Sequence, residues 1–267
     1  MRKLFFLLTT TAMMILSSCQ KDNIDGPNPN PNPNPGPGPT TPPSEKVLKK
    51  MIKTKDGAST IYTLTYDGSK KLVSIIADNN IEKTLFSYDA AGNLVKVEQS
   101  DEEFHNIYSY AYVNNVPKSA TFKSWMNRPG KPQELIEDDL LTYTVENNQV
   151  KNINLVMQLA ENATTDFAMH YNTSGNLIKV TADAPFAYTA DFTFGNKKPV
   201  FPVISKWVLD HAGFSLQYAA KNEVLSAKFD FPSNNFDRTV STQYTYDANG
   251  YVLTSTDGEA TIKFEYQ

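Results

Sequence analysis

The sequence has very little cysteine and histidine, the residues that most often build metal centres and redox sites. Of its 267 residues, one is cysteine and three are histidine. A single cysteine, Cys19, excludes an internal disulfide. His105, His170 and His211 do not fall at the spacings of a zinc site. We therefore expect no metal and no cofactor, and a domain that is stabilised by burial and hydrogen bonding.

Catalytic motifs are also missing. No serine lies in a Gly-x-Ser-x-Gly elbow, and no glycine-rich loop is suited to hold a phosphate. Acidic runs at 101–103 and 137–139 offer paired carboxylates for glycoside hydrolysis or calcium. We interpret both runs as solvated loops between strands, because consecutive acids in a loop do not fix the separation that such a pair needs. The sequence thus predicts a protein that is not an enzyme, with a hydrolase acting on surface polymers as the alternative.

The first residues have the three-part layout of a signal peptide. Arg2 and Lys3 precede an apolar stretch at 4–16 that is too short to span a bilayer stably. We expect residues 1–18 to be removed. The sequence Leu-Ser-Ser-Cys at 16–19 resembles the lipobox of bacterial lipoproteins, which implies that Cys19 is acylated and holds the chain on a membrane. A plain signal peptide with an incidental cysteine is the alternative.

A proline-rich linker follows at 19–45, with the run NPNPNPNPGPGPTTPP at 28–43. Alternating proline favours an extended chain without internal hydrogen bonds, so we predict a spacer of roughly 60 Å. A proline-rich ligand for a recognition domain is the alternative. Anchor and spacer together predict a location in the cell envelope, on the outer membrane, facing either the periplasm or the cell surface.

The net charge of the chain indicates which classes of partner are disfavoured. The formal charge is −4, and losing Arg2 and Lys3 with the signal peptide makes it −6. This mild acidity argues against nucleic acid as a partner.

Residues 46–267 form the expected domain, and a turn pattern recurs along it. The pattern reads Tyr-Asp-Ala-Ala-Gly-Asn-Leu at 88–94, Tyr-Asn-Thr-Ser-Gly-Asn-Leu at 171–177 and Tyr-Asp-Ala-Asn-Gly-Tyr-Val at 246–252. Intervals in the twenties are typical of an array of one supersecondary unit. Including looser copies, the first or anchor residues are numbers 66, 88, 112, 145, 171, 194, 218 and 246.

Each copy predicts a β-hairpin. Residues before the anchor alternate between aromatic and polar, as at 108–112, which is the pattern of a half-buried strand. Asp or Asn, with glycine three residues later, favours a type I turn with a glycine bulge. With flanking strands near 47–54 and 261–266, we predict an all-β domain without a convincing helix. It is a large antiparallel meander of about 16–18 strands, either a strongly curled sheet or a flattened barrel.

These hairpins resemble the YD repeats of Rhs and teneurin shells. Together with the lipobox and the spacer, they are similar to a family of Bacteroidota lipoproteins of unknown function with a porin-like fold. The resemblance covers most of residues 60–267 and implies a β-meander, but no activity and no catalytic residues. The copy at 112–117 lacks the glycine and that at 194–202 contains two prolines. The register of these middle copies is therefore not predicted.

We predict a non-catalytic binding or interaction protein for a glycan, peptide, lipid or envelope protein. A membrane pore is a further alternative, which the redundant lipid anchor disfavours. Anchor tyrosines are expected to pack on the sheet. Trp125 falls outside the anchor frame, in what we expect to be the longest irregular connection. Ligand sites concentrate on such loops, so Trp125, Arg128 and Tyr143 are the candidate ligand-binding residues.

Overall fold

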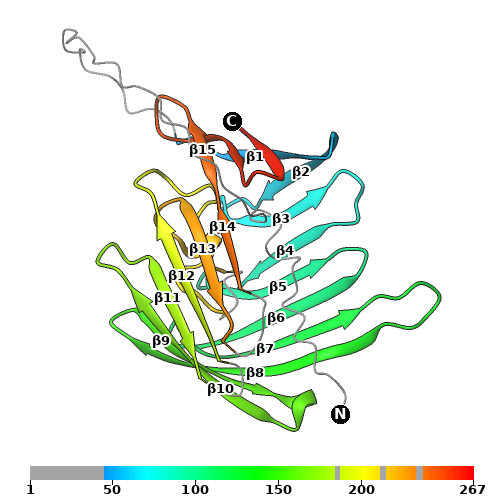
Figure 1. Cartoon of the computed structure of the whole chain (residues 1–267), viewed down its shortest axis with the longest axis vertical. Coiled ribbons are helices and arrows are strands. Elements are labelled where there is room, and N and C mark those ends of the chain that lie inside the picture. The colour runs from blue at the N-terminus through cyan, green and yellow to red at the C-terminus, as the bar shows by residue number, and fades with distance from the viewer. Residues whose placement is uncertain (1–44, 184–186, 211–214, 233–236) are drawn as a thin grey trace.

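The computed structural model describes residues 45–183, 187–210, 215–232 and 237–267 (Figure 1). They form one antiparallel sheet of 17 strands, so the predicted all-β meander is confirmed. No helix in these ranges is long and apolar enough to cross a membrane. The elements are β1 (Leu48–Lys55), β2 (Ala58–Tyr66), β3 (Leu72–Ala77), β4 (Lys83–Tyr88), β5 (Leu94–Ser100), β6 (Phe104–Val113), β7 (Val116–Met126), β8 (Glu134–Glu146), β9 (Gln149–Met157), η2 (Gln158–Ala160), β10 (Ala163–Tyr171), β11 (Leu177–Ala182), β12 (Tyr188–Phe194), α1 (Leu216–Ala219), β13 (Val224–Asp230), β14 (Arg238–Ser241), β15 (Gln243–Tyr246), β16 (Val252–Thr256) and β17 (Ala260–Tyr266).

The sheet curls back on itself into a nearly closed barrel (Figure 1). β17 pairs with β1, from Tyr266 opposite Leu48 to Ala260 opposite Lys55, so the first and last strands close the ring. β14 and β15 follow one another across Thr242; β14 pairs with β13, and β15 with β16. Within the described residues, no register pairs β14 with a strand other than β13, or β15 with a strand other than β16. This leaves a seam in the barrel beside β14.

The recurring turns have the predicted geometry. Gly92 N donates to Asp89 O, and Asp89 N donates to Asn93 O. The Asp89 carboxylate accepts a hydrogen bond from Asn93 N at 2.8 Å. Gly92 has a φ of 87°, in the left-handed region that glycine enters without a Cβ clash. Equivalent backbone bonds occur at 67–71, 172–176 and 247–251. We call the end of the barrel with these turns the turn end.

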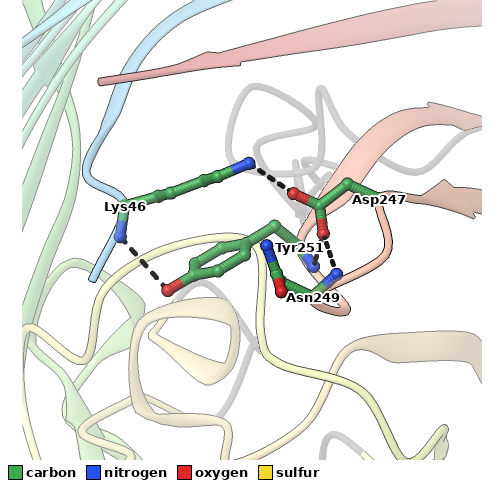
Figure 2. Close-up of polar contacts among 4 residues, drawn as sticks. All are labelled: Lys46, Asp247, Asn249 and Tyr251. Atoms are coloured by element: carbon green, nitrogen blue, oxygen red, sulfur yellow. Dashed lines mark hydrogen bonds and ion pairs between the residues drawn. The ribbon is translucent and has the colours of Figure 1, made fainter. Parts of the chain in front are cut away.

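One of these turns also holds the start of the domain. Lys46 Nζ lies 2.5 Å from Asp247 Oδ2, and Lys46 N donates to the Tyr251 hydroxyl at 3.2 Å (Figure 2). The other carboxylate oxygen of Asp247 accepts from Asn249 N and Tyr251 N. These bonds, that from Lys46 first, hold the pKa of Asp247 below its usual value. The chain therefore enters the barrel at the turn end.

The anchor tyrosines pack against the core, as predicted, and also bind the backbone. Tyr66 Oη donates to Leu48 O at 2.7 Å, and Tyr88 Oη donates to Leu72 O at 2.8 Å. Each accepting carbonyl belongs to the first residue of the preceding strand. Tyr112 makes the same kind of bond. The repeat thus supplies a row of side chains that joins neighbouring strands at the turn end.

The predicted hairpin at position 218 is wrong. Residues 195–223 connect β12 to β13, and their described part lies inside the barrel; we call it the inner segment. Trp207, Leu209 and Tyr218 belong to the buried core. The ring of Tyr218 meets that of Phe86 edge-on at 5.3 Å between centroids, and Tyr143 Oη donates to Leu209 O at 2.7 Å.

The inner segment forms the short helix α1 where the sequence predicted a strand. The apolar alternation of Leu216 and Tyr218 suggested one buried face, but Ala219 and Ala220 directly after them are buried as well. A segment surrounded by side chains has no strand edge to pair with, so its backbone groups find partners locally. Ala220 N accordingly donates to Leu216 O at 2.9 Å.

Most residues on the outer face of the sheet are polar, although Ile61, Leu85, Leu140, Ile178 and Leu253 are exposed there, and most residues on the inner face are apolar. On β10, for example, Phe167 and Met169 are buried and Asp166 and His170 are exposed. His170 faces outward. Other exposed outward residues are Thr142, Thr193, Lys228 and Lys263. A barrel that faces lipid has the opposite arrangement, with an apolar outer band.

Candidate functional site

A cavity of about 200 Å³ lies at the turn end, between the barrel wall and the inner segment. We call it the rim pocket. Asn147 and Asn148 shape its wall, because their φ values of 50° and 57° make the two-residue turn between β8 and β9. Its lining includes Asn147, Asn148 and Tyr171 from the wall, and Lys206, Trp207 and Lys221 from the inner segment.

Two buried donors of the rim pocket have no acceptor in the described structure. Trp207 is 3% exposed, and its Nε1–H has no partner; the Tyr171 hydroxyl is also buried and unpartnered. Burial raises the pKa of Tyr171, so the hydroxyl keeps its proton. An unpaired buried donor costs about 1–3 kcal/mol. We therefore expect a ligand or a water molecule to accept hydrogen bonds from these two groups.

Among the described residues that line the rim pocket, two are lysines and none is an acid. Lys206 and Lys221 both contribute to its lining. Lys206 Nζ lies 4.4 Å from the centroid of the Trp207 ring, and Lys151 Nζ lies 5.1 Å from that of Tyr171. Ammonium groups over aromatic faces are attracted to the ring quadrupole. The pocket therefore offers donors and positive charge, although the chain as a whole is acidic.

The three predicted ligand-binding residues do not come together. Trp125 lies on β7 and not in an irregular connection; it faces outward, because Ser124 before it faces inward. Arg128 follows β7, and its guanidinium pairs with Glu134 at 3.2 Å. Tyr143 lies inside the barrel, 5% exposed. No single site can use all three side chains.

Several predicted features lie outside the described residues. These are the signal peptide at 1–18, the lipidated Cys19, the linker as far as residue 44, and His211.

The acidic run at 137–139 is not a loop, which corrects the prediction. It lies within β8, so Glu137 and Asp139 face inward while Asp138 faces outward and pairs with Lys123 at 3.0 Å. Burial first, then the Asp139 carboxylate, raises the pKa of Glu137 to about 8. Burial first, then Asp138, raises the pKa of Asp139 to about 7. The sequence missed this pair because a run of three acids does not reveal strand phase.

Two further polar side chains lie beside this pair. Glu137 is opposite Ser124 on β7, and Ser124 is opposite Asn106 on β6. Ser124 and Asn106 are 0% and 4% exposed, and Ser124 Oγ and Asn106 Oδ1 have no partner in the described structure. We call these four residues the acidic wall. Within the described ranges, no group of three or more His, Cys, Asp or Glu is arranged to hold a metal ion.

Two solved structures similar to this chain are porin-like proteins. That from Bacteroides uniformis ATCC 8492 has a TM-score of 0.47 and 13% identity, and the match covers 86% of this chain and 99% of that one. That from Bacteroides vulgatus ATCC 8482 has a TM-score of 0.44 and 10% identity, covering 84% and 99%. No protein-family model matches the chain, and no curated protein matches it. These similarities are too low to assign a function of either protein to this chain.

Proposed function

We propose that the chain is a non-catalytic binding protein of the bacterial cell envelope, attached to the outer membrane through acylated Cys19. The rim pocket is its ligand site. The observation that carries this proposal is the pair of buried, unpartnered donors on Trp207 and Tyr171 in a cavity that two lysines line. A ligand with acceptor oxygens satisfies both donors and meets the positive charge.

The ligand that fits this chemistry best is a small carboxylate-bearing sugar. A carboxylate forms charge-assisted hydrogen bonds with Lys206 or Lys221, and these are about twice as strong as neutral ones. Sugar hydroxyls accept from Trp207 and Tyr171. The cavity of about 200 Å³ is smaller than the roughly 300–1,000 Å³ of ordinary ligand pockets. Its size therefore favours a single sugar unit over a lipid or a folded partner.

The polar outer face supports a barrel that stands in water. A membrane-spanning barrel needs an apolar outer band about 25 Å tall. Here Asp166, His170 and Lys228 are among the exposed outward residues. This pattern favours a tethered binding protein over a pore.

The test uses Trp207 as a reporter. The chain has two tryptophans, so a Trp125→Phe variant leaves Trp207 as the only fluorophore of this kind. We expect glucuronate, but not glucose, to change its fluorescence. In this background, Lys206→Gln with Lys221→Gln should weaken glucuronate binding at least about tenfold, because charge-assisted bonds are lost.

The matched control is Lys263→Gln, which removes an exposed lysine that pairs with Glu265 on the outer face. It should leave the glucuronate affinity unchanged. Equal responses to glucuronate and glucose would contradict an anionic ligand. The absence of any response to glucuronate and to larger uronic-acid oligosaccharides would contradict the proposal as a whole.

A hydrolase is the second candidate, and the acidic wall is the observation that favours it. Glu137 and Asp139 lie two residues apart on one face of β8, which corresponds to about 6.6 Å along the strand. Glycosidase carboxyl pairs have separations of about 5–9.5 Å. Both groups lie on one wall, however, and do not face each other across a groove. Release of reducing ends from envelope polysaccharides by the wild type, but not by Glu137→Gln, would favour the hydrolase.

A further inference from the structure

We propose that the acidic wall is a second binding site, which takes a hard cation such as Ca²⁺ through oxygen ligands. Asn106, Ser124, Glu137 and Asp139 form it, on three neighbouring strands. The site is separate from the rim pocket and does not depend on the function proposed for that pocket.

The sheet register brings these four side chains together. Asn106, Ser124 and Glu137 lie directly opposite one another in one row across β6, β7 and β8. Opposed side chains have Cβ atoms about 4.5–5.5 Å apart. Asp139 lies two residues further along β8, about 6.6 Å from Glu137. Because Ser124 is in the middle of the row, the longer Glu137 and Asn106 side chains can converge over it from both sides.

The free atoms of the site suit a hard cation. Ser124 Oγ and Asn106 Oδ1 are buried without partners, and both can act as oxygen ligands. Among the described residues, neither Glu137 nor Asp139 has an ion pair. Ca²⁺ takes 6–8 oxygen ligands from carboxylates, carbonyl groups and waters. The site lacks sulfur and imidazole, the ligands that softer metals prefer.

The electrostatics of the interior point the same way. Glu137 and Asp139 both lie in the barrel interior, on one face of β8. Tyr108 of β6 faces both acids, and Asp210 of the inner segment and Tyr143 of β8 act on Tyr108 in turn. None of these neighbours brings a positive charge. A bound cation supplies the positive charge that these neighbours lack, whereas a bound water serves only Ser124 and Asn106.

The test measures cation binding to the purified full-length protein after treatment with a chelator. Titration with CaCl₂ should give a saturable heat. At a hundredfold excess over the dissociation constant, Ca²⁺ should raise the melting temperature by about 5–10 °C. Tb³⁺ should gain luminescence that Ca²⁺ abolishes, because Tyr108 lies beside the site. Since protons compete with the cation, binding should be at least about tenfold weaker at pH 6 than at pH 8.

The decisive variants change charge but hardly change shape. Glu137→Gln with Asp139→Asn should weaken Ca²⁺ binding by about a hundredfold, because both charged ligands are lost. Asp138→Asn is the matched control, because Asp138 lies between the two on β8 but faces outward to Lys123. It should retain the wild-type affinity. Should the double variant fail to fold, Ser124→Ala removes one ligand without a change of charge and should weaken binding about tenfold.

Three outcomes would overturn the proposal. The first is a wild type that shows no heat and no shift in melting temperature with millimolar Ca²⁺ or Mg²⁺. The second is a double variant that binds Ca²⁺ as tightly as Asp138→Asn, which would put the site elsewhere. The third is a response to putrescine but not to Ca²⁺, which would assign the acidic wall to organic amines.

Discussion

The two ends of the barrel interior are built from the same kind of strands but carry opposite chemistry. At the turn end, Lys206 and Lys221 surround buried donors. Toward the other end, Glu137 and Asp139 lie beside buried acceptors. The repeat motif appears in neither set, apart from Tyr171. The comparison teaches that the repeat builds the wall, while residues between its copies give each end its chemistry.

The largest expected effect comes from loosening the inner segment. Leu209 is fully buried in the inner segment, so Leu209→Ala should lower the free energy of unfolding by about 2–5 kcal/mol. Urea unfolding followed by circular dichroism measures this. Leu140→Ala, at a residue 40% exposed on β8, should cost under about 1 kcal/mol.

The same variant sharpens the comparison of the two ends. If the ends are independent, Leu209→Ala loses glucuronate binding but keeps its Ca²⁺ affinity. Parallel loss of both ligands in a folded variant would show that one rigid interior serves both sites.

A smaller effect concerns the acidic end and pH. The folded-state pKa values of Glu137 and Asp139, about 8 and about 7, lie above those of the unfolded chain. The folded protein therefore holds more protons than the unfolded one at intermediate pH, and its stability falls as the pH rises. In metal-free buffer, we expect the free energy of unfolding to decrease measurably between pH 5 and pH 8.

Two comparisons check this origin of the pH dependence. Glu137→Gln with Asp139→Asn should flatten the decrease, and saturating Ca²⁺ should do the same in the wild type. A decrease that persists unchanged in the double variant would assign it to other groups.

The smallest effect concerns the wall itself. Tyr88→Phe removes the hydroxyl that donates to Leu72 O, which should cost about 1 kcal/mol in urea unfolding. Tyr171→Phe is the matched control, because Tyr171 occupies the same position in the repeat but its hydroxyl has no partner among the described residues. It should leave stability nearly unchanged while it weakens glucuronate binding. Equal destabilisation by the two variants would contradict the role given to the tyrosine–carbonyl bonds.

Much of the wall was predictable from the sequence because its signals are local. A turn such as 89–93 is specified by an Asp that caps backbone N–H groups and by a glycine that accepts a positive φ. The alternation around Phe167 and His170 revealed which residues face inward. The strand number followed from repeating these local units.

The candidate sites were not predictable in this way. Nothing in the local sequence around Trp207 shows that the inner segment enters the barrel. The run at 137–139 was interpreted as a loop, because three adjacent acids suit solvent and the strand phase of β8 is visible only through its partners. Trp125, Arg128 and Tyr143 are close enough in sequence to suggest one site, but strand direction and alternation separate them.

The sequence by itself determined the hairpins, their turns and the all-β class, because each depends on residues a few positions apart. Only the tertiary structure decided that β1 meets β17, that the inner segment fills the barrel, and that Asn106, Ser124 and Glu137 stand in one row. These features depend on pairings between residues far apart in the chain. Burial then changes the chemistry of the side chains. It raises the pKa values of Glu137 and Asp139, and it leaves the donors of Trp207 and Tyr171 without a partner among the described residues.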